Sequence, residues 1–251
     1  ILKRGINFIN LPSTLLAQVD SSIGGKTGIN SNRGKNLIGS FYQPKIVISE
    51  LGFLKSLSRR NLVCGFAEIL KHSLIHDNKF FNSLIKNTES ILEKFDFKII
   101  KDVITKSCKI KLYFVNQDEK EKGQRMILNF GHTFAHGIEA ANGYSRKINH
   151  GEAVLMGMML ATRLSFRKRI CSYNTLDKIE TIYETNNLPK NLISFFSKKG
   201  LNKVVSFMEI DKKNYDNKIN LILLKKIGKT TNPGDFRISP KEMRNVLKKI
   251  S

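Results

Sequence analysis

The sequence predicts a short α/β unit followed by a mostly α-helical domain. Two runs rich in β-branched residues, Ile6 to Leu11 and Lys45 to Ser49, lie near the start of the chain and predict strands. Apolar residues recur at helical spacing through most of the remaining sequence. We therefore place the boundary near residue 57, with an α/β unit over 1–57 and a helical domain over 58–251.

Turns and caps divide these two parts into further elements. Residues 13–18 resemble the first turn of a helix, whereas residues 21–36 are rich in glycine and predict a loop. The apolar period then predicts helices over 61–76, 79–94, 97–115, 128–141, 151–169 and 175–186. A strand pair is expected over 219–229. Ser239 and Pro240 should begin the last helix, with Glu242 completing a capping box.

The composition is that of a globular protein with a strong positive charge. Of the 251 residues, 41% are apolar, which is enough for a core, and the formal net charge is +22. That charge suits a nucleic-acid ligand, but Lys outnumbers Arg by 32 to 11 and is spread along the whole chain. Arg is the residue that makes bidentate contacts with phosphate and guanine. We therefore do not expect a nucleic-acid partner.

The apolar stretches and the cysteines indicate the cellular compartment that we expect for the protein. The longest apolar stretch, residues 153–164, is interrupted by a glycine and an arginine and is shorter than the roughly 20 residues that cross a bilayer. The start of the sequence lacks the small-residue cleavage site of a signal peptide. Cys64, Cys108 and Cys171 are odd in number and form no CxxC pair. These features predict a cytoplasmic protein without a membrane partner.

Three of the five histidines lie close together and give the strongest indication of chemistry. His132 and His136 are four residues apart in a predicted helix, so both imidazoles project from one face. His150 follows a turn that can fold it back towards them. A single histidine more often has a structural role, but imidazoles that converge near a carboxylate are typical of a site for a divalent ion such as zinc.

Three other segments carry polar residues placed too specifically for a solvated surface. Residues 20–36 combine glycines, which let a ligand approach the backbone, with lysines suited to phosphate, although the Walker spacing is absent. Glu68, Lys71 and His72 share one face of a predicted helix, where a plain salt bridge is the alternative. Residues 111–125 carry charges of both signs and lead into the histidines.

Motifs from these four segments resemble the 3-dehydroquinate synthase family of sugar-phosphate cyclases. The matching strings run in family order and are LPSTLLAQVDSSIGGKTGIN, GKNLIGSFYQP, GFAEILKH, DEKEKGQRMILNFGHTFAHGIEAANGY, HGEAV and DKK. The resemblance implies a dehydroquinate synthase-like fold, in which a Rossmann-like NAD-binding domain precedes a helical metal-binding domain, as in glycerol dehydrogenases. Roughly the first hundred residues of the family, with the glycine-rich turns that hold the NAD pyrophosphate, have no counterpart here. We therefore expect the α/β unit to be truncated and the chain alone to be inactive.

The resemblance also implies which residues bind metal and which react. The metal ligands would be Glu68, His132 and His150, binding zinc or cobalt, which revises the pair of His132 and His136 suggested by spacing. His136 would then serve proton transfer and contact the phosphate, because Glu68, His132 and His150 as the three protein ligands spare the remaining histidine of the segment. The implied catalytic residues are Asp20, Lys71 and His136.

Substrate and cofactor contacts are implied in the same way. Lys111 and Arg125 would bind a substrate carboxylate. The residues implied around the phosphate are Lys26, Asn36, Asn129 and Lys213. Arg4 would reach into the site of a partner subunit, so the resemblance implies a homodimer. The residues implied at the NAD site are Ser13, Thr14, Lys26 and Lys35.

The implied reaction closes the ring of 3-deoxy-D-arabino-heptulosonate 7-phosphate to give 3-dehydroquinate with loss of phosphate, a lyase step of the shikimate pathway to aromatic amino acids. The nearest alternative is a cyclase that makes an inosose or a valiolone, but Lys111 with Arg125 favours a substrate acid. A polyol dehydrogenase would need no phosphate cluster. A basic nucleic-acid-binding helical protein would explain the charge but not the three metal ligands.

Overall fold

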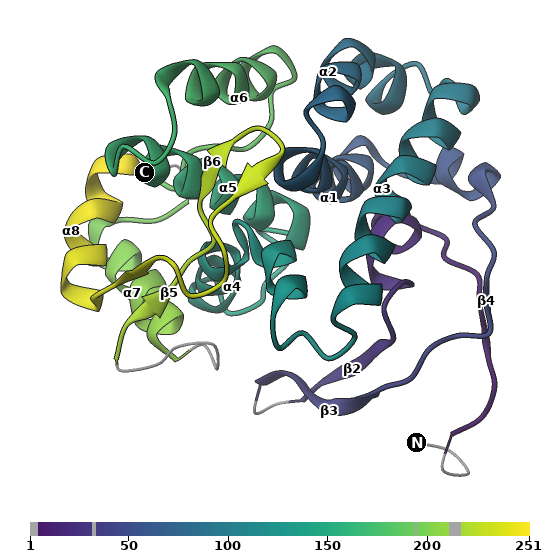
Figure 1. Cartoon of the computed structure of the whole chain (residues 1–251), viewed down its shortest axis with the longest axis horizontal. Helices are drawn as coiled ribbons and strands as arrows, with labels where there is room; N and C mark the ends of the chain where they lie inside the picture. Colours follow the sequence, from purple (N-terminus) through teal and green to yellow (C-terminus); the bar gives the residue numbers. More distant parts are fainter. Residues whose placement is uncertain (1–4, 32–33, 194, 211–216) are drawn as a thin grey trace.

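The computed structural model describes residues 5–31, 34–193, 195–210 and 217–251. Figure 1 shows a body of helices with a strand-rich extension formed by the first part of the chain. The helices are α1 (Arg59–His76), α2 (Asn78–Leu92), α3 (Phe97–Gln117), α4 (His132–Ala141), α5 (His150–Arg167), α6 (Tyr173–Thr185), α7 (Lys198–Glu209) and α8 (Pro240–Ile250), and short helical turns are η2 (Ala17–Ser21), η3 (Leu51–Ser56) and η4 (Gln124–Asn129). The strands are β1 (Ile9–Asn10), β2 (Lys26–Ser31), β3 (Gly34–Phe41), β4 (Ile46–Val47), β5 (Ile219–Asn220), β6 (Leu224–Lys226), β7 (Lys229–Thr230) and β8 (Arg237–Ile238).

Most predicted helices are confirmed, because their starts carry capping residues. Ser58, Asp77 and Asp96 each accept a hydrogen bond from a backbone N–H of the helix that follows, which gives α1, α2 and α3 their starts. The expected helices over 151–169 and 175–186 appear as α5 and α6. Ser239 caps α8 as predicted.

Two helical expectations were wrong in detail. The helix expected over 128–141 is broken, because Gly131 adopts a left-handed conformation with φ of 78°. The chain before it forms the turn η4, and α4 begins at His132. Helix α7 was not expected at all. Its start is capped by Ser197, and its buried residues Leu201, Val204 and Met208 recur at helical spacing, a period that was overlooked in this lysine-rich segment.

The strands form four separate pairs among the described residues. The loop expected over 21–36 is instead part of an antiparallel hairpin, in which β2 pairs with β3 and Ile29 lies opposite Ile38. The strand pair expected over 219–229 is confirmed only for β6 and β7, since β5 pairs with β8. The two strands predicted at the start, β1 and β4, are parallel, with Ile9 opposite Ile46 and both side chains exposed.

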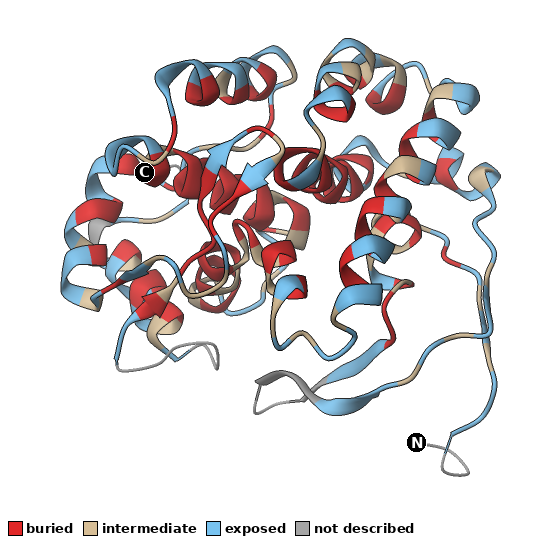
Figure 2. Ribbon diagram, in the orientation of Figure 1, coloured by how far each residue is buried: buried red, intermediate tan, exposed pale blue. Residues whose placement is uncertain are grey.

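Helix α1 lies at the centre of the helical body. Every residue from Leu62 to Ile75 is buried, and the helix is red in Figure 2 over most of its length. It packs against α2, α3 and α5, while α4 packs against α5 and α7. A helix buried on all sides is normally apolar throughout. The polar residues Glu68, Lys71 and His72 in α1 therefore need partners within the protein.

Helix α5 approaches α1 and α4 closely at two glycines. A Cβ atom added to Gly151 would lie 2.3 Å from the Cα atom of Cys64, and one added to Gly157 would lie 2.2 Å from the carbonyl oxygen of Gly131. No side chain fits at either crossing. Both crossings lie beside candidate metal ligands, since Gly151 follows His150 and Gly131 precedes His132.

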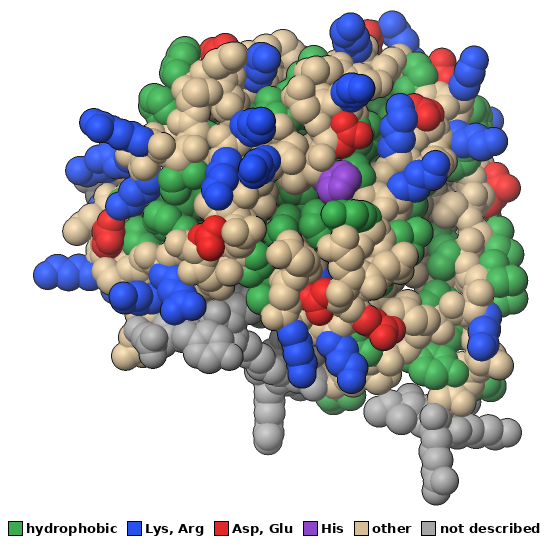
Figure 3. Space-filling view, viewed as in Figure 1, with side chains coloured by type: hydrophobic (Ala, Val, Ile, Leu, Met, Phe, Trp, Pro, Cys, Tyr) green, Lys and Arg blue, Asp and Glu red, His purple; other side chains and the backbone are tan. Residues whose placement is uncertain are grey.

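The surface carries its charge in a dispersed pattern. Figure 3 shows Lys and Arg side chains spread over the visible face, with acidic side chains among them. Within the described residues, none of the helices has the length and apolar character that a membrane span requires.

Candidate active site

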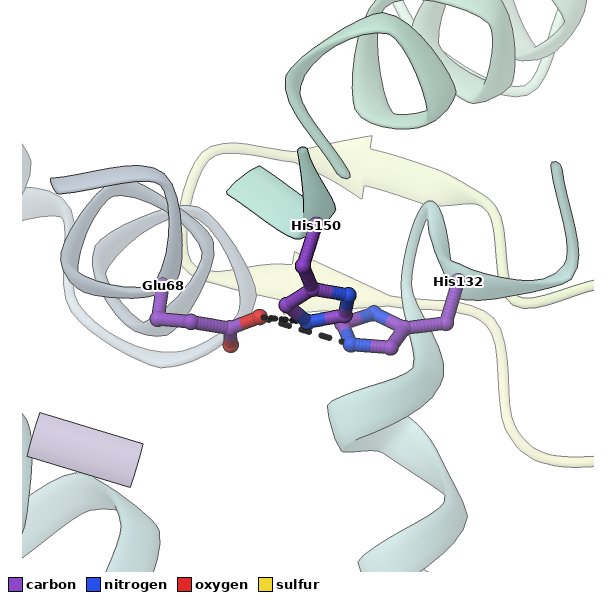
Figure 4. Close-up of side chains that lie close together, drawn as sticks. All are labelled: Glu68, His132 and His150. Carbon is purple, nitrogen blue, oxygen red and sulfur yellow. Dashed lines mark ion pairs between the residues drawn. The ribbon is translucent and has the colours of Figure 1, made fainter. Parts of the chain in front are cut away.

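Three side chains from three helices converge at the centre of the molecule. Glu68 lies in the middle of α1, while His132 and His150 are the first residues of α4 and α5. Their ligand atoms all lie within 4.8 Å of one another. Figure 4 shows both imidazoles pointing at the carboxylate of Glu68.

The geometry of this group fits a tetrahedral metal ion. The Nε2 atoms of His132 and His150 lie 3.4 Å and 3.5 Å from the same oxygen, Oε1 of Glu68. Two ligand atoms bound to a tetrahedral ion at about 2.0–2.1 Å are separated by roughly 3.3–3.4 Å. Within the part of the chain that the structure describes, neither carboxylate oxygen of Glu68 accepts a hydrogen bond of good geometry, although both are buried. One carboxylate and two imidazoles are also the donor set of a catalytic zinc site, with room for substrate oxygens.

The ionisation of Glu68 and His132 suits this role, whereas His150 must lose a proton before it can bind a metal ion. Burial would raise the pKa of Glu68, but the Lys71 ammonium and the His132 imidazole outweigh burial and hold that pKa well below its usual range. Burial, together with Lys71, lowers the pKa of His132 to about 4, so this imidazole is neutral at pH 7. Burial opposes the charged form of His150, but its hydrogen bond to Glu139 and the nearby Glu68 carboxylate raise its pKa to about 9.

His136 lies beside this group without joining it. Its ring meets that of His132 edge to face, with centroids 5.7 Å apart. Among the described side chains close enough to share an ion, His132 is grouped with Glu68 and His150, and His136 is not a member. The structure thus brings together the ligand set implied by the family resemblance rather than the pair suggested by spacing.

One face of α1 positions the first turn of α5. Arg60, Cys64 and Glu68 recur at every fourth residue, so they share that face. Arg60 binds both carboxylate oxygens of Glu152, at 2.6 Å and 2.7 Å, and Cys64 Sγ accepts the N–H of Gly151 at 3.2 Å.

The turn before α5 is fixed as well. Asn149 and Glu152 form a reciprocal capping box, and Arg60 donates hydrogen bonds to the carbonyl oxygens of Arg146 and Lys147. The position of His150, between Asn149 and Gly151, is therefore set by contacts on both sides of it.

A balanced ionic cluster adjoins the metal ligands. Lys71 forms an ion pair with Glu68, and Lys111 of α3 donates a hydrogen bond to Asp20 Oδ1 at 2.7 Å. His72 Nε2 lies 4.0 Å from the same oxygen, and its Nδ1 is 2.7 Å from Ser107 Oγ. Two carboxylates thus face two ammonium groups in a largely buried space, which keeps the net charge near zero.

The cluster also fixes protonation states. Burial would raise the pKa of Asp20, but Lys111 outweighs burial and lowers it to about 2. Burial and Lys71 lower the pKa of His72 to about 3, so its imidazole is neutral. Asp20, Glu68 and His72 also lie close enough to share an ion. A second ion is not needed there, because the two ammonium groups already pair with both carboxylates.

Two of the residues expected around a phosphate meet on one carboxylate. Lys26, at the start of β2, forms an ion pair with Glu121, and Asn129 donates a hydrogen bond to the other oxygen of Glu121 at 2.8 Å. Glu121 was not expected in the site. It follows α3 in a loop where it adopts a left-handed conformation with φ of 55°.

Arg125, expected to bind a substrate carboxylate, donates hydrogen bonds to the backbone in this structure. It is 2% exposed and donates to the carbonyl oxygens of Gly24, at 2.9 Å, and Glu119. A side chain at Gly24 would collide with its guanidinium group. In this structure Arg125 ties the turn before β2 to the loop after α3. Lys111 alone of this expected pair lies in the ionic cluster.

The residues expected at the NAD site are only partly described. Thr14 accepts the N–H of Ala17 and so supports η2, which carries Asp20, while Ser13 is exposed. The side chains of Lys35 and Asn36 lie outside what the structure describes, as do Arg4 and Lys213 entirely.

Three residues of the site were missed in the sequence. Glu139 accepts a hydrogen bond from His150 Nδ1 at 3.1 Å, Glu121 joins Lys26 to Asn129, and Arg60 fixes the turn before His150. The helical period held a signal for two of them. Glu139 lies two turns after His132, and Arg60 two turns before Glu68, each on the ligand's own face.

Comparison of sequences identifies one family over residues 1–214. Residues 1–64 match the family description "3-dehydroquinate synthase N-terminal", and residues 65–214 match "3-dehydroquinate synthase C-terminal". The 3-dehydroquinate synthase of Pelagibacter ubique (strain HTCC1062) is 54% identical over 226 residues, which cover 90% of this chain and 61% of that protein. A second relative, from Dictyoglomus thermophilum, is 48% identical, and the chain spans 62% of its length.

Solved structures share the fold. The 2-epi-5-epi-valiolone synthase of Streptomyces hygroscopicus, with NAD+ and Zn2+ bound, superposes with a TM-score of 0.87 at 24% identity, over 100% of this chain and 68% of that one. A 2-deoxy-scyllo-inosose synthase complexed with carbaglucose-6-phosphate, NAD+ and Co2+ gives 0.85 at 24% identity with the same coverage. A glycerol dehydrogenase of Schizosaccharomyces pombe gives 0.63 at 11% identity, over 98% and 63%. The expected fold class is thereby confirmed.

Proposed function

Because the chain belongs to the 3-dehydroquinate synthase family, we propose that the protein containing it converts 3-deoxy-D-arabino-heptulosonate 7-phosphate to 3-dehydroquinate and phosphate. One observation carries the proposal. A ligand set of Glu68, His132 and His150 adjoins a buried cluster of Asp20, Lys71 and Lys111, so side chains that could hold a metal ion lie beside groups that can move protons.

The metal ligands are Glu68, His132 and His150. A zinc or cobalt ion there would polarise the substrate's hydroxyl groups, and NAD+ would accept and return a hydride. Glu68 supplies an ionised carboxylate, because its pKa is held well below its usual range, and His132 supplies a neutral imidazole. Both forms are those that bind metal without first losing a proton.

Proton transfer falls to residues around the ligands. Asp20, ionised and held by Lys111, accepts the proton of the reacting hydroxyl, and Lys71 contacts the hydroxyl oxygen. His136, beside His132 and unbound to metal, serves the phosphate end of the substrate.

The two anionic ends of the substrate, its carboxylate and its phosphate, would each bind positively charged side chains. Lys111 is the ammonium group near the metal ligands that suits a carboxylate, with Arg125 supporting the surrounding backbone. Lys26 and Asn129 suit a phosphate, which would take the place that the Glu121 carboxylate holds between them. Asn36 and Lys213 complete this set in the proposal.

The proposal keeps the division at residue 57. Residues 1–57 would supply Ser13, Thr14, Lys26 and Lys35 to NAD, and residues 58–251 the metal and most substrate contacts. A homodimer, with Arg4 reaching the partner's site, completes the assembly. Three unpaired cysteines support a reducing compartment such as the cytoplasm.

The test is a phosphate-release assay on the protein that contains this chain, with NAD+, zinc and the heptulosonate phosphate, together with detection of 3-dehydroquinate. We expect both products in equal amounts and no net formation of NADH. Glucose 6-phosphate and glycerol serve as the comparison substrates. Turnover of glucose 6-phosphate would indicate an inosose-type cyclase, and oxidation of glycerol with NADH release would indicate a polyol dehydrogenase. Either result without turnover of the heptulosonate would overturn the proposal.

A further inference from the structure

Glu139 is a buried carboxylate that neither the metal site nor the proton-transfer groups described above account for. It lies on α4, two turns after His132, and is 7% exposed. Its Oε1 atom is 3.1 Å from Nδ1 of His150. A carboxylate is costly to bury without a specific partner, so this contact marks a defined arrangement.

The contact uses the ring nitrogen of His150 that faces away from Glu68. Nε2 points to Glu68 Oε1, and Nδ1 points to Glu139, so the imidazole lies between two carboxylates. An ionised carboxylate only accepts hydrogen bonds, so Nδ1 must carry the hydrogen and donate it. The lone pair of the neutral ring is then on Nε2, which faces the other candidate ligands.

His132 shows the same arrangement with a weaker acceptor. Its Nε2 faces Glu68, and its Nδ1 lies 3.3 Å from the carbonyl oxygen of Phe130. Both imidazoles thus present Nε2 to one point and anchor Nδ1 on the protein. The two anchors differ in charge, because one is a backbone carbonyl and the other a carboxylate.

We propose that Glu139 is a positioning residue of the metal centre, which fixes the ring orientation and tautomer of His150 and strengthens it as a ligand. This inference rests on the metal site of the proposed function. Carboxylates that hold metal-bound histidines typically change metal affinity by about 10- to 100-fold when they are removed. A purely structural ion pair between Glu139 and His150 would change the stability of the metal-free protein and leave the coordination of the ion unaltered.

The test compares Glu139→Gln and Glu139→Ala with the unmodified chain. Zinc affinity is measured by competition with a chromophoric chelator, the melting temperature is measured without metal, and the visible absorption of bound Co2+ reports the ligand geometry. The Gln variant keeps an oxygen that accepts the Nδ1 hydrogen, so we expect it to lose less than about tenfold in zinc affinity, whereas the Ala variant should lose about 10- to 100-fold with an altered cobalt spectrum. The matched control is Glu180→Gln. It removes a half-buried carboxylate of α6 that pairs with Arg163 and contacts none of the candidate metal ligands in the described structure.

The outcomes separate this inference from the metal site itself. Unchanged zinc affinity and an unchanged cobalt spectrum in both Glu139 variants, with binding lost in Glu68→Gln, would overturn the role of Glu139 alone. No zinc binding by the unmodified chain would overturn the metal site and the inference together. If the Ala variant does not fold, the Gln variant decides. Lower zinc affinity with an unchanged metal-free melting temperature supports a positioning role for Glu139. A lower metal-free melting temperature with unchanged zinc affinity contradicts it.

Discussion

Gly151 donates its backbone N–H to the sulfur of Cys64 at 3.2 Å, where α5 crosses α1 with no room for a side chain between them. The contact lies one residue after His150 and one helical turn before Glu68. The separation of these two ligands therefore depends on how closely the two backbones approach. A thiol of raised pKa suits this structural role, because burial keeps Cys64 protonated and unreactive.

Gly151→Ala should weaken metal binding. The added methyl would lie 2.3 Å from a backbone atom, which cannot move aside as a side chain could, so α5 must shift away from α1. Overpacking of this kind costs about 1–3 kcal/mol, more than the roughly 0.5–1 kcal/mol that alanine gains over glycine in a helix. We expect a lower melting temperature and weaker zinc binding in chelator competition. Gly200→Ala, where the methyl meets only the Phe196 side chain, should change neither, and equal behaviour of the two variants would contradict this account.

Glu68→Gln should abolish stoichiometric zinc binding. The unmodified chain is expected to retain about one equivalent of zinc after mild chelation, measured by elemental analysis. The amide is a poor ligand, and it also leaves the buried ammonium of Lys71 without its carboxylate partner. Glu89→Gln removes an exposed carboxylate paired with Lys94 and should bind zinc normally. Retention of a full equivalent by the Glu68 variant would exclude this carboxylate from the site.

His136→Ala should separate metal binding from turnover. Because His136 lies outside the group of candidate ligands, the variant should keep its zinc. Loss of a general acid or base typically lowers turnover by about 10²- to 10⁴-fold, which is the expected drop in the full-length protein. Zinc analysis and phosphate release on the same preparation give both readings. Loss of zinc together with turnover would instead favour the pair of His132 and His136.

The sequence predicted elements well where one local signal decides the structure. Capping residues such as Ser58 and Ser239, followed by an apolar period, gave helix starts close to those observed. Prediction from the sequence failed where a contact between distant segments determines the local structure. Residues 21–36 were predicted to be a glycine-rich loop, and it is cross-strand pairing, such as that of Ile29 with Ile38, that makes residues 26–41 a hairpin. Gly131 breaks a helix because α5 crosses it, which no local pattern reveals.

The candidate site shows the same limit. Motif order placed Glu68, His132 and His150 together, but spacing alone would have chosen His136. The family resemblance assigned Arg125 to a substrate carboxylate. Its partners in the structure are the carbonyl oxygens of Gly24 and Glu119, and carbonyl positions cannot be read from side-chain types. The acceptor that faces the second ring nitrogen of a metal-binding histidine likewise depends on the fold, so it could not be predicted from the sequence.

Glu121→Gln should strengthen phosphate binding. The carboxylate of Glu121 neutralises Lys26 and accepts from Asn129, so it competes with any anion for the same two groups. An ion pair with an exposed partner contributes about 0.2–1 kcal/mol, which corresponds to at most about fivefold in affinity. Calorimetric titration with inorganic phosphate measures the change. Glu119→Gln, whose carboxylate contacts Gln43, is the control, and weaker phosphate binding in the Glu121 variant would show that Glu121 helps to build the site.

Acid should loosen the loop between α3 and η4 through Asp118. Its carboxylate accepts the backbone N–H groups of Lys122, Gly123 and Arg125. Burial opposes ionisation more than any single contact favours it, but these hydrogen bonds together outweigh it and lower the pKa of Asp118 below its ordinary value of 3.8. Because the folded-state pKa is the lower one, the stabilisation is complete above about pH 4 and is lost as the pH falls through the folded-state value.

Asp118→Asn tests this dependence directly. Hydrogen bonds to a carboxylate contribute about 1.5–3 kcal/mol when buried, which partial exposure reduces here to about 1 kcal/mol. Melting temperatures of the variant and the unmodified chain should therefore differ at pH 7 and converge as the pH falls below about 4. Asp177→Asn, an exposed carboxylate on α6, should follow the unmodified chain throughout. A difference between the Asp118 variant and the unmodified chain that stays constant down to pH 2.5 would mean that the charge of Asp118 does not hold the loop.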